Sequence, residues 1–159
     1  LFNGNTLVGL DSISKEEYAR IFDVLKKENI NLIVATPTFA KLLVLDKDFN
    51  SENFESLKCI YFCGEILEVK LVKKLKDRFK DIKIINAYGP TEATSAVTGI
   101  PIDDCMLNEE YLPVGKISTA ATKIDIETAA IVLSGPSVFG GYIGNISGGH
   151  FIKDRKRLL

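Results

Sequence analysis

The sequence has 159 residues, of which 46% are hydrophobic and 26% are charged, and its formal net charge at pH 7 is −1. This composition is ordinary for a globular chain with a buried core, and the nearly neutral balance argues against a nucleic-acid-binding surface. The aliphatic runs are too short to span a bilayer, which argues against membrane insertion.

The cysteines and the histidine show no metal-ligand pattern. Cys59 and Cys63 are four positions apart, Cys105 is remote, and His150 is the single histidine. An odd cysteine count also argues against a disulfide framework. We therefore expect reduced thiols and a cytoplasmic location.

Four short runs in the first hundred residues predict β-strands, at positions 6–10, 31–35, 58–62 and 83–86. The run at 31–35 is continuously apolar, which is typical of a parallel strand that is covered on both faces. The segments between the strands have the periodicity of helices.

Three helices are predicted between these strands. An S-x-x-E capping box formed by Ser14 and Glu17 opens the first. The second has Thr36 as a plausible N-cap and Pro37 in its first turn. The third is amphipathic, with a buried face formed by Leu67, Leu71, Val72, Leu75 and Phe79. The alternation predicts an α/β fold, with an open, mainly parallel sheet flanked by helices in a flavodoxin-like arrangement.

The pattern changes after about residue 100. The segments 123–127 and 130–135 are short and rich in β-branched residues, and no helical pattern separates them. We expect an α/β subdomain over residues 1–103, followed by a partial β subdomain over residues 104–159.

Two polar stretches, "FCGE" and "NAYGPTE", follow the third and fourth predicted strands. Ligands of open α/β sheets bind at the carboxyl ends of the strands. Gly64 and Gly89 would let the backbone approach a ligand, and Tyr88 could present a ring to a flat base. Thr91 and Glu92 offer oxygens of the kind that position phosphate and magnesium. The stretches therefore predict a nucleotide at this edge.

Simpler interpretations of the same residues stay open at this point. A Gly-Pro pair after a strand is usually a turn, and a Thr-Glu pair often starts a helix. Cys63 taken alone is typical of a buried core thiol.

Five stretches in order resemble the core motifs of the adenylate-forming enzymes, in particular the amino-acid adenylation domains. They are "TPTFAKLLVL", "YFCGEIL", "NAYGPTEATSAVTGI", "LPVGK" and "AAIVLSGPSVFGGYIG". "YGPTE" identifies the superfamily, whereas "FCGE" with "EATSAVTGI" is similar to the D-alanine–carrier protein ligases. The resemblance covers nearly the whole chain.

The resemblance implies a nucleotide site and a catalytic pair. The implied nucleotide-binding residues are Gly64, Glu65, Asn86, Ala87, Tyr88 and Gly89. Tyr88 would stack on adenine, and Gly64, Glu65 and Asn86 would border adenine and ribose. Thr91 would lie near the phosphates of ATP, and Glu92 would hold Mg²⁺.

The resemblance also implies an amino-acid pocket lined by Tyr61, Cys63, Ala87 and Ser95. Tyr61 and Cys63 share strand parity, so both could face one cavity. In the D-alanine branch the cysteine of "FCGE" narrows the pocket around the methyl group. A small amino acid, D-alanine, is the expected substrate.

The implied reaction has two half-reactions. The substrate carboxylate attacks the α-phosphate of ATP to form aminoacyl-AMP and pyrophosphate, and the phosphopantetheine thiol of an acyl or peptidyl carrier protein then takes the aminoacyl group. In the D-alanine branch this feeds D-alanylation of teichoic acids in Gram-positive bacteria.

Departures from the family pattern favour a fragment. The phosphate loop, the upstream aspartate for the substrate ammonium group and the C-terminal catalytic lysine are not in this sequence, and the first residue is Leu1. Ala129 and Ala130 stand where the family usually has Gly-Glu. We expect no amino-acid-dependent ATP–pyrophosphate exchange by these 159 residues alone. The alternatives are a non-catalytic binding or interaction module, or a fragment of an acyl-CoA synthetase.

Overall fold

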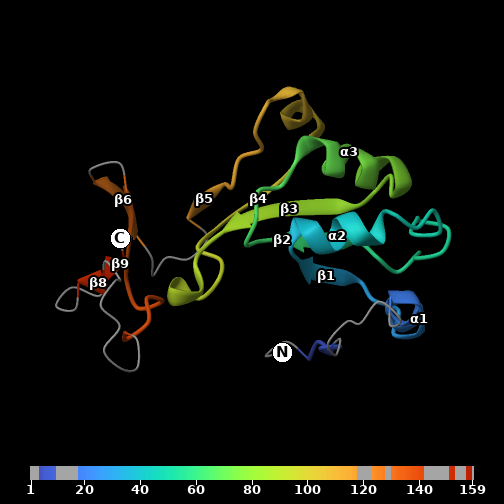
Figure 1. The fold of residues 1–159 in the computed structure, drawn as a ribbon, viewed down its shortest axis with the longest axis horizontal. Coiled ribbons are helices and arrows are strands. Elements are labelled where there is room, and N and C mark those ends of the chain that lie inside the picture. The colour runs from blue at the N-terminus through green and yellow to red at the C-terminus, as the bar shows by residue number, and fades with distance from the viewer. Residues whose placement is uncertain are drawn as a thin grey trace.

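The structure is a computed structural model that describes residues 4–9, 18–117, 123–127, 130–141, 151–152 and 157–158. Within them a five-stranded sheet carries helices, and a separate four-stranded sheet follows (Figure 1). The predicted α/β fold is therefore confirmed.

The first sheet has the strand order β1-β2-β3-β4-β5. Its strands are β1 (Leu32–Ala35), β2 (Cys59–Phe62), β3 (Lys83–Tyr88), β4 (Thr98–Pro101) and β5 (Lys116–Ile117). The pairs β1·β2 and β2·β3 are parallel, whereas β3·β4 and β4·β5 are antiparallel. The sheet is thus mixed, because the chain returns from β3 to β4 through a short loop, without the crossover that a parallel neighbour requires.

One face of this sheet carries the helices α1 (Tyr18–Lys27), α2 (Pro37–Leu43) and α3 (Val69–Arg78). The strand register aligns Ile33, Ile60 and Ile84 in one row, and all three are buried against the helices. All five residues predicted for the buried face of the third helix are buried. Thr36 caps α2 as predicted, since its hydroxyl oxygen accepts a hydrogen bond from the backbone N–H of Phe39.

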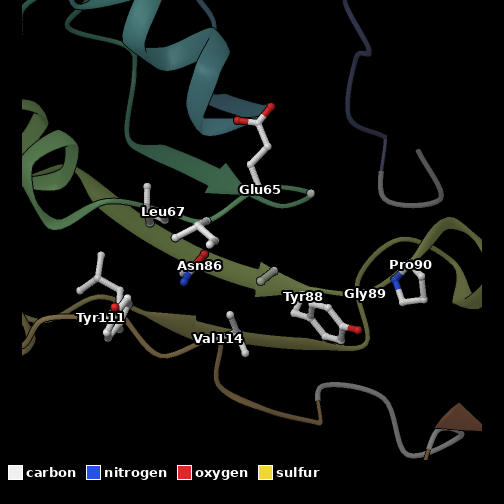
Figure 2. A pocket seen from close by; sticks show the side chains of 12 residues that line it. Glu65, Leu67, Asn86, Tyr88, Gly89, Pro90, Tyr111 and Val114 are labelled. Carbon is white, nitrogen blue, oxygen red and sulfur yellow. The ribbon is translucent and has the colours of Figure 1, made fainter. Parts of the chain in front are cut away.

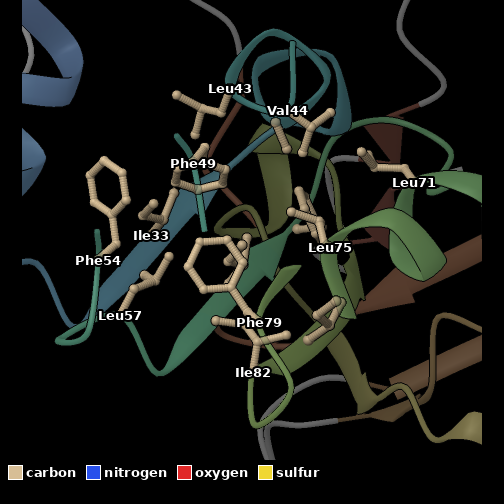
Figure 3. Packing of buried hydrophobic residues seen from close by; sticks show 14 of the residues in the cluster. Ile33, Leu43, Val44, Phe49, Phe54, Leu57, Leu71, Leu75, Phe79 and Ile82 are labelled. Atoms are coloured by element: carbon tan, nitrogen blue, oxygen red, sulfur yellow. The ribbon is translucent and has the colours of Figure 1, made fainter. Parts of the chain in front are cut away.

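Phenylalanine rings from different segments fill the centre of this core (Figure 3). The ring of Phe49 lies 4.9 Å from that of Phe79, 5.2 Å from that of Phe54 and 6.1 Å from that of Phe22, measured between centroids. All three pairs are edge-on, which is an arrangement that aromatic pairs prefer. Phe49 therefore links the loop after α2 to α1 and to the end of α3.

The opposite face of β1 is open in the described part of the chain. Leu32 is 51% exposed and Val34 is 69% exposed. The prediction of a strand covered on both faces is therefore wrong here, because the described helices all pack on the face of Ile33.

The first predicted strand is also wrong. Residues 6–9 form no strand, and Leu7 is exposed, so this apolar run has no partner strand that would fix it in a sheet. Leu10 and the predicted capping box of Ser14 and Glu17 lie outside the described residues.

The second sheet has the order β6-β7-β9-β8, and all its strand pairs are antiparallel. Its strands are β6 (Lys123–Glu127), β7 (Ala130–Ser134), β8 (Phe151–Ile152) and β9 (Arg157–Leu158). This is the small β unit predicted after residue 100. The division into subdomains 1–103 and 104–159 stays a prediction, although β5 from beyond residue 103 belongs to the first sheet. None of the described helices has the length and apolar character needed to cross a membrane.

We predict that Phe49→Ala lowers the free energy of unfolding by about 3–5 kcal/mol, because it leaves a cavity among three rings. The measurement is denaturant unfolding followed by far-UV circular dichroism. The control is Leu45→Ala on the same loop, which removes a side chain that is 72% exposed and should change stability by about 0.5 kcal/mol or less. Equal effects of the two changes would contradict the packing described for Phe49.

Candidate functional site

A pocket of about 490 Å³ lies at the carboxyl ends of β2 and β3 (Figure 2). The six residues predicted to bind nucleotide all line it: Gly64, Glu65, Asn86, Ala87, Tyr88 and Gly89. The structure thus brings them together, and their role as nucleotide ligands stays a prediction.

Further lining residues were missed by the sequence analysis: Ile66, Leu67, Pro90, Tyr111, Leu112 and Val114. Three of them come from the segment 111–114, which is remote from the other two stretches in the sequence. The motif "LPVGK", which overlaps this segment, was the available signal, but its position in the sheet could not be derived from the sequence.

Two buried polar side chains hold the segment 111–114 over the strands. Asn86 is 2% exposed, and its amide nitrogen donates a hydrogen bond to the carbonyl oxygen of Pro113 at 2.9 Å. The hydroxyl of Thr98, which is also buried, donates to the carbonyl oxygen of Val114 at 2.7 Å. Buried polar groups must find such partners, so these bonds fix one wall of the pocket.

The loop from β3 to β4 makes a tight return. Thr94 and Ser95 both have positive φ angles, 65° and 64°, a conformation that costs free energy in residues other than glycine. The backbone N–H of Val97 donates to the carbonyl oxygen of Tyr88 at 2.8 Å and closes the loop. A Cβ atom on Gly89 would lie 2.7 Å from the backbone oxygen of Ser95, so the loop has room only for glycine there.

Thr91 and Glu92 lie on a short 3₁₀ helix, η2 (Thr91–Ala93), directly after the lining residue Pro90. The carbonyl oxygen of Glu92 accepts a hydrogen bond from the backbone N–H of Phe139 at 2.7 Å. The hydroxyl of Thr94 donates to the carbonyl oxygen of Ser137 at 2.9 Å. These bonds tie the predicted catalytic turn to the segment that follows β7.

Three of the predicted amino-acid pocket residues, Tyr61, Cys63 and Ala87, lie on the sheet face opposite the helices, and Ser95 lies in the loop between β3 and β4. The thiol of Cys63 donates to the carbonyl oxygen of Ser95, with 3.0 Å between sulfur and oxygen. A Cβ atom on Gly99 would lie 3.7 Å from the Tyr61 hydroxyl and 4.0 Å from the Ala87 Cβ, so those two side chains flank one small space. Burial, and then the nearby Cys63, raise the pKa of the Tyr61 phenol.

Ala87 is the residue common to the two predicted sites. It is buried and lines the pocket at the strand ends, while it shares the face of Cys63 and Tyr61. The two predicted sites therefore adjoin through β3.

Glu65 occupies a different position from the other predicted nucleotide ligands. Its Oε2 atom accepts hydrogen bonds from the Thr38 hydroxyl at 2.6 Å and from the Thr38 backbone N–H at 2.9 Å. These bonds lower the pKa of the Glu65 carboxyl below its ordinary value, so it is ionised at neutral pH.

The family model described as AMP-binding enzyme matches residues 1–143 of the chain. A D-alanine–D-alanyl carrier protein ligase of Bacillus licheniformis is 38% identical over 157 residues, covering 91% of this chain and 31% of the relative. The ligase of the same description from Streptococcus agalactiae is 37% identical over 153 residues, covering 89% and 30%. The chain thus spans under a third of the length of these relatives.

Two solved structures that share the fold are described as containing an adenylation domain. A nonribosomal peptide synthetase protein containing adenylation and PCP domains matches with a TM-score of 0.66 and 25% identity, over 79% of this chain and 27% of its own. A Vibrio cholerae adenylation domain in complex with glycyl-adenosine-5'-phosphate matches with a TM-score of 0.67 and 20% identity, over 83% and 28%. The second likeness shows the fold alone.

We predict that Gly89→Ala destabilises the chain by about 1–3 kcal/mol, because the new methyl group overlaps backbone atoms that cannot simply rotate away. The control is Gly140→Ala, where a Cβ atom would meet nothing within 4 Å. Thermal unfolding of the two variants separates the outcomes. Identical melting temperatures would show that the loop is not as tight as described.

Proposed function

Because the chain belongs to the AMP-binding enzyme family, we propose that it forms part of an ATP-dependent ligase that activates D-alanine as its adenylate. The observation that carries the proposal is the pocket at the ends of β2 and β3, in which the six nucleotide-binding candidates meet. The relatives named as D-alanine–D-alanyl carrier protein ligases support the substrate class.

The pocket has features that suit an adenosine group. Its volume of about 490 Å³ falls in the range of small-molecule sites. Tyr88 is 37% exposed and lines the pocket, where a base can stack on its ring. Apolar neighbours such as Val114 and Leu67 would exclude water from the base edges.

The chemistry we propose is attack of the amino-acid carboxylate on the α-phosphate of ATP. A new P–O bond forms to the carboxylate oxygen as the bond to pyrophosphate breaks, and no protein nucleophile is needed. Thr91, on the turn after the pocket, would donate a hydrogen bond to the phosphates. Stabilising charge as it develops on phosphate oxygens is the main contribution that such a site makes.

Mg²⁺ fits this turn only as a partly solvated ion. The described residues contain no group of three or more His, Cys, Asp or Glu side chains that could hold a metal. Mg²⁺ is commonly bound by one or two carboxylates together with substrate phosphates, so the Glu92 carboxylate suffices as a protein ligand. When bound, the ion would neutralise phosphate charge.

The acceptor we propose is the phosphopantetheine thiol of a carrier protein. The relatives are named as carrier protein ligases, and a structural neighbour contains both adenylation and PCP domains. In this proposal a second half-reaction transfers the aminoacyl group from AMP to the thiol sulfur.

The proposal is tested with the complete protein that contains this sequence. We expect ATP–pyrophosphate exchange that depends on D-alanine, with weaker exchange for L-alanine and serine. Exchange that depends on a fatty acid and not on any amino acid would instead support an acyl-CoA synthetase. Nucleotide binding without any exchange would support a non-catalytic module.

We predict that Cys63→Ala in the complete protein relaxes the choice between D-alanine and L-alanine by about tenfold to a hundredfold, because lost contacts in a small pocket change discrimination by that order. Specificity constants for D-alanine, L-alanine and serine provide the measurement. The control is Cys105→Ala, which removes an exposed thiol from η3 (Asp104–Asn108). Unchanged ratios with a lowered melting temperature would make Cys63 a core residue.

We also predict that Glu92→Gln lowers the adenylation rate about 100-fold, the effect typical of removing one group that stabilises charge. The dependence of the rate on Mg²⁺ concentration should shift to higher concentrations. Glu55→Gln, at an exposed carboxylate, serves as the control. A wild-type rate with the wild-type Mg²⁺ dependence would assign Glu92 to the turn alone.

A further inference from the structure

We propose that Glu65 is a positioning residue for the nucleotide pocket, which acts through Thr38 rather than by contacting the nucleotide. This inference rests on the proposed function, since it concerns the same pocket. It assigns to Glu65 a different role from the direct nucleotide contact that the family resemblance implies.

The geometry directs the carboxylate away from the pocket interior. Figure 2 shows the Glu65 side chain extending toward α2, while Asn86 and Tyr88 lie on the other side of the 64–67 segment. Both hydrogen bonds from Thr38 converge on one carboxylate oxygen, at 2.6 and 2.9 Å. Hydrogen bonds to an ionised acceptor are the strong ones, so this contact is well suited to fix a backbone.

The turn at the start of the 64–67 segment has no side chain of its own to fix it, although Leu67 at the other end of the segment is buried in the core. Gly64 has a φ angle of +94°, and a Cβ atom there would meet only the Thr36 methyl group, at 3.9 Å. Glycine allows the sharp turn after β2 but provides no side chain to anchor it. Glu65, as the next residue, supplies the anchor.

A second link joins the same two segments. The ammonium group of Lys41 on α2 lies 2.6 Å from the carboxylate of Glu68. Glu68 is exposed, as Glu65 is, but it does not line the pocket. A single exposed ion pair of this kind contributes little to stability. Glu68→Ala therefore provides a matched control, because Glu68 also bonds to α2 but does not line the pocket.

The consequence concerns the backbone of residues 64–67, which forms the wall facing Asn86 and Tyr88. If the Glu65 side chain is removed, the backbone of residues 64–67 is no longer held at a fixed distance from Asn86 and Tyr88. The loss should weaken ATP binding and leave the chemical step nearly unchanged, because the carboxylate touches no reacting atom. An increase in KM for ATP at constant kcat is the expected signature.

The experiment uses the complete ligase and measures KM and kcat for ATP in D-alanine-dependent exchange, with the dissociation constant for ATP from calorimetry. We expect Glu65→Ala to raise KM about tenfold, and Thr38→Val, which keeps the backbone donor, about threefold. Glu65→Gln retains an acceptor oxygen and should restore KM to within about threefold of the wild type. Glu68→Ala should change KM by less than about twofold.

The double variant Glu65→Ala/Thr38→Val distinguishes positioning from direct contact. Under positioning it is no worse than Glu65→Ala, because both changes remove one interaction. A Thr38→Val variant with wild-type KM, or effects that multiply in the double variant, would overturn the inference in favour of direct contact. An unchanged KM in Glu65→Ala would also overturn it.

Failure of the proposed function gives a different result. In that case the unmodified protein shows neither ATP binding nor amino-acid-dependent exchange. If the unmodified protein is active and all four single variants match it, only the positioning role fails.

Discussion

The pocket depends on the need of buried polar groups for hydrogen-bond partners. Asn86 and Thr98 lie at the ends of neighbouring antiparallel strands, and each bonds a backbone carbonyl of the segment 111–114. An unpaired buried amide or hydroxyl would cost about 1–3 kcal/mol. The segment is therefore held over the strand ends, and Tyr111, Leu112 and Val114 become part of the pocket although they lie far from it in the sequence.

The sequence predicted those parts of the fold that are determined by local periodicity. The apolar stripe from Leu67 to Phe79 and the cap at Thr36 required only neighbouring residues, and both are confirmed. The direction of β4 was not predictable, because it depends on the turn at Gly89 and on the strained loop through Thr94. The short apolar run at 6–9 was wrongly predicted to be a strand. A strand needs a neighbouring strand to pair with, and composition alone does not show whether one is present.

The candidate site was predictable where glycine and polar residues follow strands directly. "FCGE" and "NAYGPTE" lie at adjacent strand ends, so their proximity follows from the parallel pairing of β2 and β3. The hydrogen bonds between Glu65 and Thr38 were not predictable, because the two residues are 27 positions apart in the sequence. The positive φ angle of Gly64, directly before Glu65, was likewise not specified by any sequence pattern.

The open face of β1 has a consequence for handling the isolated chain. β1 is the end strand of its sheet in the described part of the chain, and it exposes Leu32 and Val34. End strands present unpaired backbone groups that can template pairing with another molecule, and natural proteins often protect them with lysine or proline. Self-association at high protein concentration is therefore a hazard of this segment, and Val34→Lys is the substitution that would counter it without altering the strand-end pocket.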